Sequence, residues 1–383
     1  MKIIYDHQAF SFQEYGGISR YFSELMKCSS NESDIEHKLL IKYSNNNYIP
    51  DNVIVKRFSP NHRFKGRNKI IEYLNRFYSK SALNRDRDYD LFHPTYYDPY
   101  FLKAIDNIPF VITIHDFAHE SFPDSFNNFD YTSRYKKILA VEANRIIAIS
   151  EFTKNDIMKN YNVHESKIDV IYHASSISPL NTQEPINHMH NLSAKYKVNR
   201  VVNLPENFIL YIGKRNSYKN FPFFLKAVKE VLSLKNKYYV VCVGGGRFNR
   251  NEIHLLEKLH LTDKIIQLNA DDKSLAYIYA KAKVFVYPSL YEGFGIPVLE
   301  AFSCGCPAVL SNNTALPEVG ANAALYFDPE NIDNLTTILL KILGSPELRN
   351  KLKKEGIERA KLFSWKKTAK KTFEVYKKTI KQK

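Results

Sequence analysis

The apolar and polar positions of this chain follow two periods, one typical of buried strands and one typical of amphipathic helices. The run 284–287 (VFVY) reads as a short strand closed by Pro288, and Pro297 begins an apolar helical run. Strand and helix patterns of this kind alternate over 2–173 and again over 208–327. The alternation predicts an α/β fold with two doubly wound, Rossmann-like domains.

A polar stretch rich in Ser, Asn and Pro separates the two halves and has little apolar periodicity. It predicts a linker at 181–206 between a first domain, 1–180, and a second domain, 207–364. A last amphipathic helix is expected over 365–383. At 383 residues the chain is long enough to bury two hydrophobic cores.

Composition excludes several classes of protein. No apolar run reaches the roughly 18 residues of a membrane-spanning helix. The apolar run at the N-terminus breaks at Asp6 and His7, so no secretory signal is expected and the protein is expected to be cytoplasmic. The four cysteines lack the paired spacing of a zinc site and are expected to be reduced.

The segment EGFGIPVLE contains a glycine turn followed by the start of a helix, and it begins and ends with the carboxylates Glu292 and Glu300. Gly293 and Gly295 let a ligand approach the backbone, and the N–H groups of a helix N-terminus attract anions such as a diphosphate. Carboxylates at these positions can accept hydrogen bonds from the hydroxyls of a sugar or ribose. The segment therefore predicts a binding site for a phosphorylated sugar compound.

With the LPEVG that follows at 316–320, this segment resembles the donor-site signature of retaining GT-B glycosyltransferases of family 4. The resemblance implies a GT-B fold, in which the terminal helix crosses back to the first domain. It implies transfer of a hexose-type sugar from a nucleotide-diphosphate sugar, with no metal or other cofactor. By analogy, Glu300 would bind ribose, and the sugar and phosphate would be held by Glu292 and the amides of Gly293, Phe294, Gly295 and Ile296.

A basic loop, GKRNSYKN, begins at Gly213, where a strand-like run ends. Fixed cations suit a diphosphate, because negative charge grows on the β-phosphate as the bond to the sugar breaks. Members of the family carry a basic residue just after this glycine and a Lys six positions after it, which here correspond to Lys214 or Arg215 and to Lys219 followed by Asn220. The choice between Lys214 and Arg215 stays open.

The first half contains two more candidate ligand positions. Gly16 and Gly17 open a helix in YGGISRYFSEL, which resembles the first glycine loop of the family. His115 ends the apolar strand 110–114, and ligands gather at the carboxyl ends of strands in open α/β sheets. HDF with a downstream Pro resembles the family's His motif, which approaches the donor sugar. The Asp-x-Asp at 86–88 does not end a buried strand, so no metal site is expected there.

The net charge of +15 is concentrated in two segments, with +8 in 56–87 and +11 in 349–383. Basic segments of this kind can bind nucleic acid, anionic lipid or a phosphorylated substrate. Helical spacing of Ile70, Leu74 and Phe77 predicts a basic amphipathic helix in the first segment. We expect the two segments to meet on one face of the first domain.

The expected partners are a nucleotide-sugar donor, a glycan or lipid-linked acceptor and an anionic membrane surface, and not nucleic acid. The expected setting is bacterial surface polysaccharide biosynthesis, such as O-antigen or capsule, with peripheral attachment to the inner face of the plasma membrane. One alternative is transfer to a soluble acceptor, and another is an inactive GT-B binding protein. Intact Glu292, Glu300 and Lys219 favour an enzyme. The nucleotide, the sugar, the linkage and the oligomeric state stay open.

Overall fold

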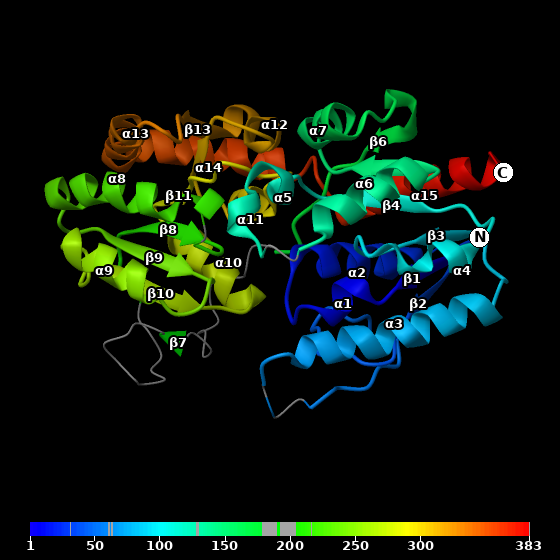
Figure 1. Cartoon of the computed structure of the whole chain (residues 1–383). Helices are drawn as coiled ribbons and strands as arrows, with labels where there is room; N and C mark the ends of the chain where they lie inside the picture. Colours follow the sequence, from blue (N-terminus) through cyan, green and yellow to red (C-terminus); the bar gives the residue numbers. More distant parts are fainter. Residues whose placement is uncertain are drawn as a thin grey trace. The chain divides into compact units, whose positions relative to one another are not determined.

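The chain divides into two compact units in the computed structural model (Figure 1). The first unit combines Met1–His173 with Ser364–Lys383, and the second comprises Ala174–Phe363. The expected linker, 181–206, lies almost entirely outside the described residues. The structure describes residues 1–30, 32–59, 62, 64–127, 130–177, 190–191, 204–215 and 217–382.

The first unit is built on parallel strands in the orders β2-β1-β3 and β4-β5-β6. A bridge between Phe92 and Phe110 joins the two groups into one series of six strands. Most strand residues are buried and apolar, as in parallel sheets that helices cover on both faces. The strands are β1 (Lys2–Asp6), β2 (Glu36–Leu40), β3 (Leu91–His93), β4 (Val111–Ile114), β5 (Arg145–Ala148) and β6 (Ile168–Val170).

Two long helices of the first unit lie on opposite faces of this sheet. The chain passes from β1 to its neighbour β2 through α2, and then returns past β1 to β3 through α3. Because crossovers between parallel strands are right-handed, this change of direction puts α2 and α3 on opposite faces. The C-terminal helix α15 packs against α2 and shares its face. The α-helices are α1 (Gln8–Ser11), α2 (Gly17–Ser29), α3 (Arg67–Arg85), α4 (Leu102–Ile105), α5 (Ala118–Ser121), α6 (Thr132–Glu142), α7 (Glu151–Tyr161) and α15 (Trp365–Lys381).

Helices α3 and α15 therefore lie on opposite faces of the first unit, and residues 349–363 belong to the second unit. The expectation that the two basic segments meet on one face of the first domain is wrong. Segment 56–87 contains α3, and segment 349–383 contains α15. In Figure 1, α3 runs along the lower side of the first unit while α15 lies behind its upper part. The reversal of strand order at β1 causes this separation, and neither segment carries a local signal for it.

Helix α15 completes the core of the first unit, which confirms that the terminal helix crosses back to it. The side chains of Trp365, Phe373 and Tyr376 are buried. The Tyr376 hydroxyl lies 2.6 Å from Nδ1 of His93, whose Nε2 lies 3.0 Å from Oγ1 of Thr113. This buried chain of hydrogen bonds joins α15 to β3 and β4, and it fixes the position of the helix on the sheet.

The second unit is a seven-stranded sheet in the order β13-β12-β11-β8-β9-β10-β7. The strands pair in parallel, apart from the short β7, which is antiparallel to β10. The strands are β7 (His190–Asn191), β8 (Phe208–Ile212), β9 (Tyr239–Val243), β10 (Ile265–Asn269), β11 (Val284–Tyr287), β12 (Ala308–Ser311) and β13 (Ala324–Phe327).

Helices pack on the sheet of the second unit around one large apolar core. Helix α8 buries Phe221, Phe224 and Val228 on one stripe, with Pro222 in its first turn, as the period of its sequence predicts. No helix among the described residues is both long and apolar enough to cross a bilayer. The helices are α8 (Phe221–Leu234), α9 (Arg250–Lys258), α10 (Asp272–Lys281), α11 (Ile296–Ser303), α12 (Leu316–Gly320), α13 (Ile332–Gly344) and α14 (Pro346–Ala360). Single 3₁₀ turns are η1 (Pro99–Phe101), η2 (Pro123–Ser125), η3 (Glu165–Lys167), η4 (Ser217–Lys219) and η5 (Ala321–Ala323).

The buried histidines of the first unit should make its stability depend on pH. Burial lowers the pKa of His93 to about 3, and it lowers the pKa of His7 and His115 similarly, whereas an exposed histidine titrates near 6.5. The unfolded chain therefore binds more protons between these values. The contribution of these histidines to the free energy of unfolding should be fully present above pH 6.5. As the pH decreases toward 3, each buried histidine should lower the free energy of unfolding by up to about 1.4 kcal/mol for each pH unit.

Urea unfolding at a series of pH values measures this dependence. In His93→Gln the free energy of unfolding should depend less steeply on pH, because unfolding then takes up about one proton fewer. The matched control is His254→Gln on the exposed surface of α9, which should leave the dependence unchanged. Equal slopes in wild type and His93→Gln would contradict the assignment.

Candidate active site

The strand order of the second unit reverses at β8. From β8 the chain continues outward to β9 and β10, and it then crosses back to β11 on the other side of β8. In open α/β sheets, ligands bind outside the carboxyl ends of the strands at such a reversal. Residues 213–220 follow β8 and residues 288–295 follow β11. Both loops carry residues that the sequence predicts for the donor.

An ion pair joins these two loops. The Nζ of Lys219 donates to Oε1 of Glu292 over 2.5 Å, and the two side chains are only 16% and 11% exposed. The backbone N–H of Leu290 also donates to the carbonyl of Tyr218, 2.7 Å away. Charge-assisted hydrogen bonds of this length are short and strong, so Lys219 is held in one place at the edge of the sheet.

Neighbouring polar groups fix Glu292 in turn. Its backbone N–H donates to Oγ1 of Thr314 over 3.2 Å, and Asn313 donates from Nδ2 to the carbonyl of Leu290 over 2.9 Å. Burial, followed by the charge of Glu292, raises the pKa of Tyr287 well above its usual value. Sequence reasoning did not identify Tyr287, Asn313 or Thr314 as part of this site.

The glycine turn after Glu292 leads directly into α11. Gly295 has φ +105°, and a Cβ at this position would lie 2.9 Å from a methyl group of Leu316, so both conformation and space require glycine. Amide groups in the first turn of a helix have no acceptor within it and can bind an anion. The Phe294 ring is buried against Phe363. Gly293 belongs to the turn and Ile296 is the first residue of α11.

Glu300 lies on α11 with its side chain largely buried. The hydroxyl of Tyr279, on α10, donates to its Oε2 over 3.0 Å. Burial, followed by the charge of Glu300, raises the pKa of Tyr279, so this hydroxyl keeps its proton. Tyr279 therefore fixes the orientation of the carboxylate. The Tyr279 position has no local sequence signal, because its contact comes from the packing of α10 against α11.

The side chain of Arg215 has a structural role in the second unit rather than a role in ligand binding. Its guanidinium donates to the carbonyl oxygens of Gly244, Gly246 and Arg247 over 2.8, 2.9 and 3.1 Å. Its Nε donates to Oε1 of Glu252 over 2.8 Å. Most of the donors of this buried side chain are therefore used within the second unit.

The loop that Arg215 holds is the glycine triplet after β9. Gly244, Gly245 and Gly246 have φ values of +85°, +73° and +72°. A Cβ on Gly245 would lie 2.7 Å from Nη1 of Arg215, so glycine is required for this close approach. Lys214 is exposed, in contrast to Arg215, which makes Lys214 the better candidate for the cation beside the diphosphate.

The remaining residues of the basic loop shape the backbone. Gly213 has φ +119° directly after β8. Asn220 has φ +57° at the start of α8, and its Nδ2 donates to the carbonyl of Pro329 over 2.9 Å. Its side chain therefore ties the loop to the segment after β13, a structural role that the sequence pattern alone does not indicate.

Three predicted ligand positions belong to the first unit. Gly16 is the N-cap of α2 and Gly17 is its first residue. His115 follows β4 directly, is buried, and has Nδ1 3.4 Å from Nε2 of His173. The contact of these residues with a donor stays a prediction.

Acidic residues that resemble a metal motif are engaged in ion pairs. Asp86 pairs with Lys38, and Asp88 pairs with Lys2. Within the described parts of the chain, no group of three or more His, Cys, Asp or Glu side chains is arranged to hold a metal ion.

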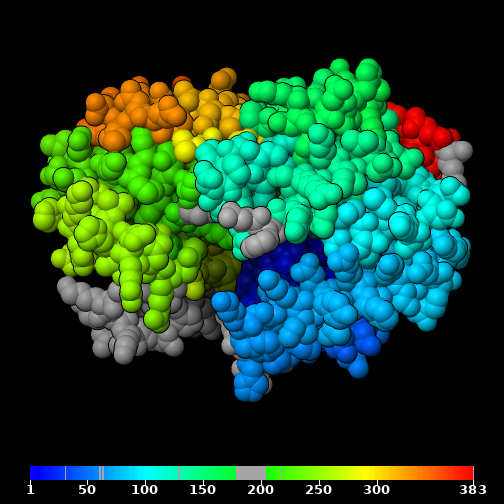
Figure 2. Space-filling model, viewed as in Figure 1, coloured from blue at the N-terminus to red at the C-terminus, as the bar shows by residue number. Residues whose placement is uncertain are grey.

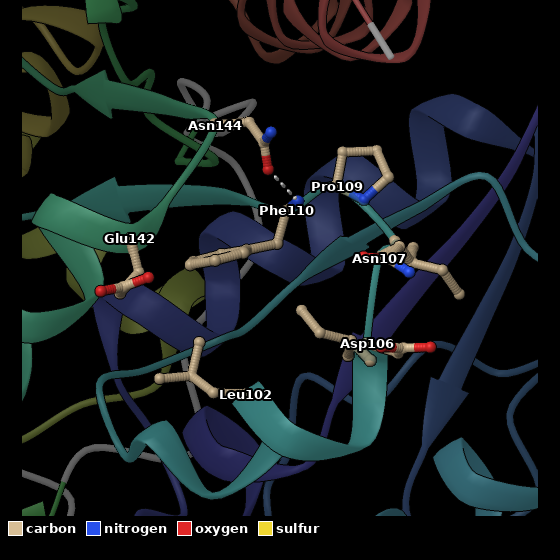
Figure 3. Close-up of a pocket in the computed structure, with 9 residues that line it drawn as sticks. Leu102, Asp106, Asn107, Pro109, Phe110, Glu142 and Asn144 are labelled. Atoms are coloured by element: carbon tan, nitrogen blue, oxygen red, sulfur yellow. Dashed lines mark hydrogen bonds between the residues drawn. The ribbon is translucent and has the colours of Figure 1, made fainter.

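A pocket of about 280 Å³ in the first unit lies at the amino ends of the strands, opposite to the edge where ligands are expected (Figure 3). Phe110 precedes β4 and Asn144 precedes β5, so the pocket is at their amino ends. Asn144 accepts from the backbone N–H of Phe110 at its Oδ1, 2.9 Å away. The polar groups here connect strand starts, and the ligand edge of the sheet is the opposite one.

Known proteins resemble this chain along most of its length. Residues 194–359 match the family described as Glycosyl transferases group 1, and residues 15–175 match Glycosyltransferase Family 4. The O-antigen chain mannosyltransferase B of Escherichia coli is 31% identical over 302 residues, which cover 77% of this chain and 76% of that protein. The chain belongs to the family 4 glycosyltransferases.

Further comparisons agree with this family 4 assignment. The O-antigen chain mannosyltransferase RfbU of Salmonella typhimurium is 31% identical over 237 residues, covering 62% of this chain and 61% of that protein. The structure of sucrose-phosphate synthase from Thermosynechococcus elongatus aligns over 100% of both chains with a TM-score of 0.77 and 19% identity. At this identity the structural likeness shows the fold, which is GT-B. The protein is therefore a transferase enzyme with the fold that the sequence predicts.

The contrast between Lys214 and Arg215 leads to a prediction. Arg215→Gln should lower the thermal midpoint of the protein, because it removes the hydrogen bonds of the guanidinium to the carbonyls of 244–247 and to Glu252. Lys214→Gln should leave the midpoint unchanged and raise the KM for the sugar donor, because an exposed cation contributes to ligand binding and not to folding. Calorimetry and steady-state kinetics measure the two effects. An unchanged midpoint in Arg215→Gln with a large rise in KM would reverse the assignment.

Proposed function

We propose that this glycosyltransferase moves a hexose-type sugar from a GDP- or UDP-sugar to a glycan or lipid-linked acceptor, with retention of anomeric configuration and without a metal ion. The observation that carries this proposal is the Lys219–Glu292 pair beside the glycine turn, at the carboxyl ends of β8 and β11. A cation, a helix N-terminus and two carboxylates meet the needs of a diphosphate and a sugar in one place.

The proposed chemistry follows from the positions of these groups. When the bond between the sugar and the diphosphate breaks, its electron pair stays on the phosphate oxygen. Lys219 and the first-turn amides of α11 would stabilise that charge, since they are fixed before the reaction and are shielded from water. Lys214 would add a second cation. Glu292 would orient both Lys219 and the sugar hydroxyls, and Glu300, oriented by Tyr279, would bind the ribose.

Mannose is the sugar that the similarity favours, since the two relatives described above are named O-antigen chain mannosyltransferases. We propose the same setting for this chain, which is the synthesis of a bacterial surface polysaccharide such as O-antigen or capsule. The acceptor would be bound by the first unit and carried by a membrane lipid. The enzyme would then work on the cytoplasmic side, attached peripherally to an anionic membrane surface.

Donor chemistry provides the first test. Turnover with a nucleotide-diphosphate mannose should persist in EDTA, because amides and lysines replace a metal at the diphosphate. The product should keep the anomeric configuration of the donor when it is analysed by NMR. A thermal-shift panel of nucleotide sugars identifies the donor beforehand, since a specific ligand raises the apparent stability. An inverted product, or activity that EDTA abolishes and manganese restores, would rule out the proposal.

Two substitutions test the roles of the charged residues. Lys219→Ala should lower kcat by an equivalent of about 2 to 4 kcal/mol, because a cation at the leaving group stabilises the transition state more than the bound substrate. Glu300→Ala should mainly weaken nucleotide binding, measured by calorimetry. Lys229→Ala, on the exposed side of α8, is the matched control for Lys219 and should leave kcat unchanged. Near-native activity in folded Lys219→Ala and Glu300→Ala would show that the site is elsewhere.

A further inference from the structure

The inward side of helix α3 carries polar residues as well as the apolar Ile71, Ala82 and Leu83. Asn75 is fully buried at its centre, and its Oδ1 accepts from the backbone N–H groups of Lys42 and Tyr43 over 3.0 and 2.9 Å. Its Nδ2 donates to the carbonyl of Tyr43 over 2.6 Å and to Oγ of Ser11 over 2.9 Å. A single side chain therefore satisfies four polar groups, and rotation of the helix would break all of these bonds.

The same inward side carries two more polar anchors. Ser79 is buried and accepts from the hydroxyl of Tyr100 over 2.9 Å. Arg67, in the first turn, is buried and forms an ion pair with Glu14. Arg67 is therefore bound within the protein, although its place in the basic segment suggests a surface cation. These polar contacts act together with the burial of Ile71 and Leu83 to set which side of α3 faces the unit.

The outward side of α3 carries large apolar side chains. Ile70, Tyr73 and Phe77 are 42%, 71% and 75% exposed, at positions that share one helical face. Phe64, just before the helix, is 47% exposed. Figure 2 shows the blue surface of this part of the chain on the outside of the first unit. Single exposed apolar residues are ordinary, but several in line on one helix indicate a binding surface.

Cations flank this apolar stripe. Lys65, Lys69 and Lys80 are exposed, and Arg76 lies beside them with one nitrogen 3.2 Å from Oδ2 of Asp98. The sequence of α3 contains a single acidic residue, Glu72, which is only partly exposed. We define the outer face of α3 as Lys69, Ile70, Tyr73, Arg76, Phe77 and Lys80.

We propose that the outer face of α3, with Phe64 and Lys65, lies in the headgroup region of an anionic bilayer. The inference rests on the proposed function, since a lipid-linked acceptor would be presented in that plane. A stripe parallel to the helix axis, with aromatic rings in its middle and lysines around it, suits a helix that lies flat in the interface. Anionic headgroups match the positive charge, and the apolar region below them accepts the rings.

The fold determines which face of the first unit would lie on the bilayer. Helix α15 also presents lysines to solvent, but it lies on the opposite face of the sheet and its exposed positions lack large apolar residues from Trp365 to Lys381. One planar bilayer cannot contact both faces. Binding through α3 therefore leaves the lysines of α15 away from the membrane.

A tryptophan introduced on the stripe reports insertion directly. Trp365 is the chain's only tryptophan and is 9% exposed, so its emission should change little. In Tyr73→Trp, emission should shift to shorter wavelength with vesicles that contain phosphatidylglycerol, and not with pure phosphatidylcholine vesicles. High salt should reverse the shift, because screening weakens attraction to the headgroups. Lipids brominated near the headgroup should quench the emission.

Three sets of substitutions locate the binding surface by co-sedimentation with the same vesicles. Tyr73→Gln with Phe77→Gln should weaken binding at least about tenfold without a change of charge. Lys65→Gln, Lys69→Gln and Lys80→Gln together should weaken it roughly a hundredfold at low salt. The control removes the same charge from α15 through Lys366→Gln, Lys370→Gln and Lys371→Gln, and should change binding less than about twofold.

Equal loss of binding in the α3 and α15 lysine variants would overturn the proposal in favour of general electrostatic attraction. Unchanged binding in the Tyr73 and Phe77 variant, with an unchanged thermal midpoint, would overturn it as well. The proposal would also be overturned if a single-stranded oligonucleotide bound more tightly than the vesicles and did not shift the emission of the introduced tryptophan. The thermal shift caused by the nucleotide-sugar donor should be normal in every variant, so a failed vesicle experiment is distinguishable from a failed donor assignment.

Discussion

The ion pair between Lys219 and Glu292 depends on the strand order of the second unit. The two residues are 73 positions apart, and they meet because β8 and β11 are neighbours although two strands lie between them in sequence. Their loops end at the same edge, where the glycine turn also begins α11. Any ligand placed there meets a cation held by a carboxylate and a helix N-terminus together. The site is thus a product of topology as much as of residue type.

Local patterns were enough to predict the elements that carry this site. The strand 284–287 and the helix that starts at Pro297 were expected from the sequence, and the structure has β11 at Val284–Tyr287 and α11 at Ile296–Ser303. The sequence could not assign Arg215, because its partners are carbonyl oxygens of a loop 30 residues away that only the folded sheet brings close. The Tyr279 contact with Glu300 was missed for the same reason.

The periodicity of apolar residues correctly predicts helix α3, but it does not show which side of the helix is buried. Its spacing predicts an amphipathic helix, but two stripes compete for the interior, one with Ile71 and Asn75 and the other with Ile70 and Phe77. The stripe with Asn75 faces inward, where its four hydrogen bonds reach backbone groups of the segment after β2 and Ser11. These partners are distant in sequence, so the exposure of the aromatic stripe follows from tertiary structure alone.

Net charge alone would point to a different surface from the one that we propose for membrane binding. The more basic segment, 349–383, contributes α15, whose inner side chains Trp365 and Tyr376 complete the core of the first unit. Its lysines are the solvated surface of a helix whose role is structural. The less basic segment carries the exposed rings, and apolar burial adds a contribution that salt does not screen. Right-handed crossovers place α2 and α3 on opposite faces, and α15 packs beside α2. In the orientation that we propose, the rings of α3 would therefore enter a bilayer and α15 would stay in water.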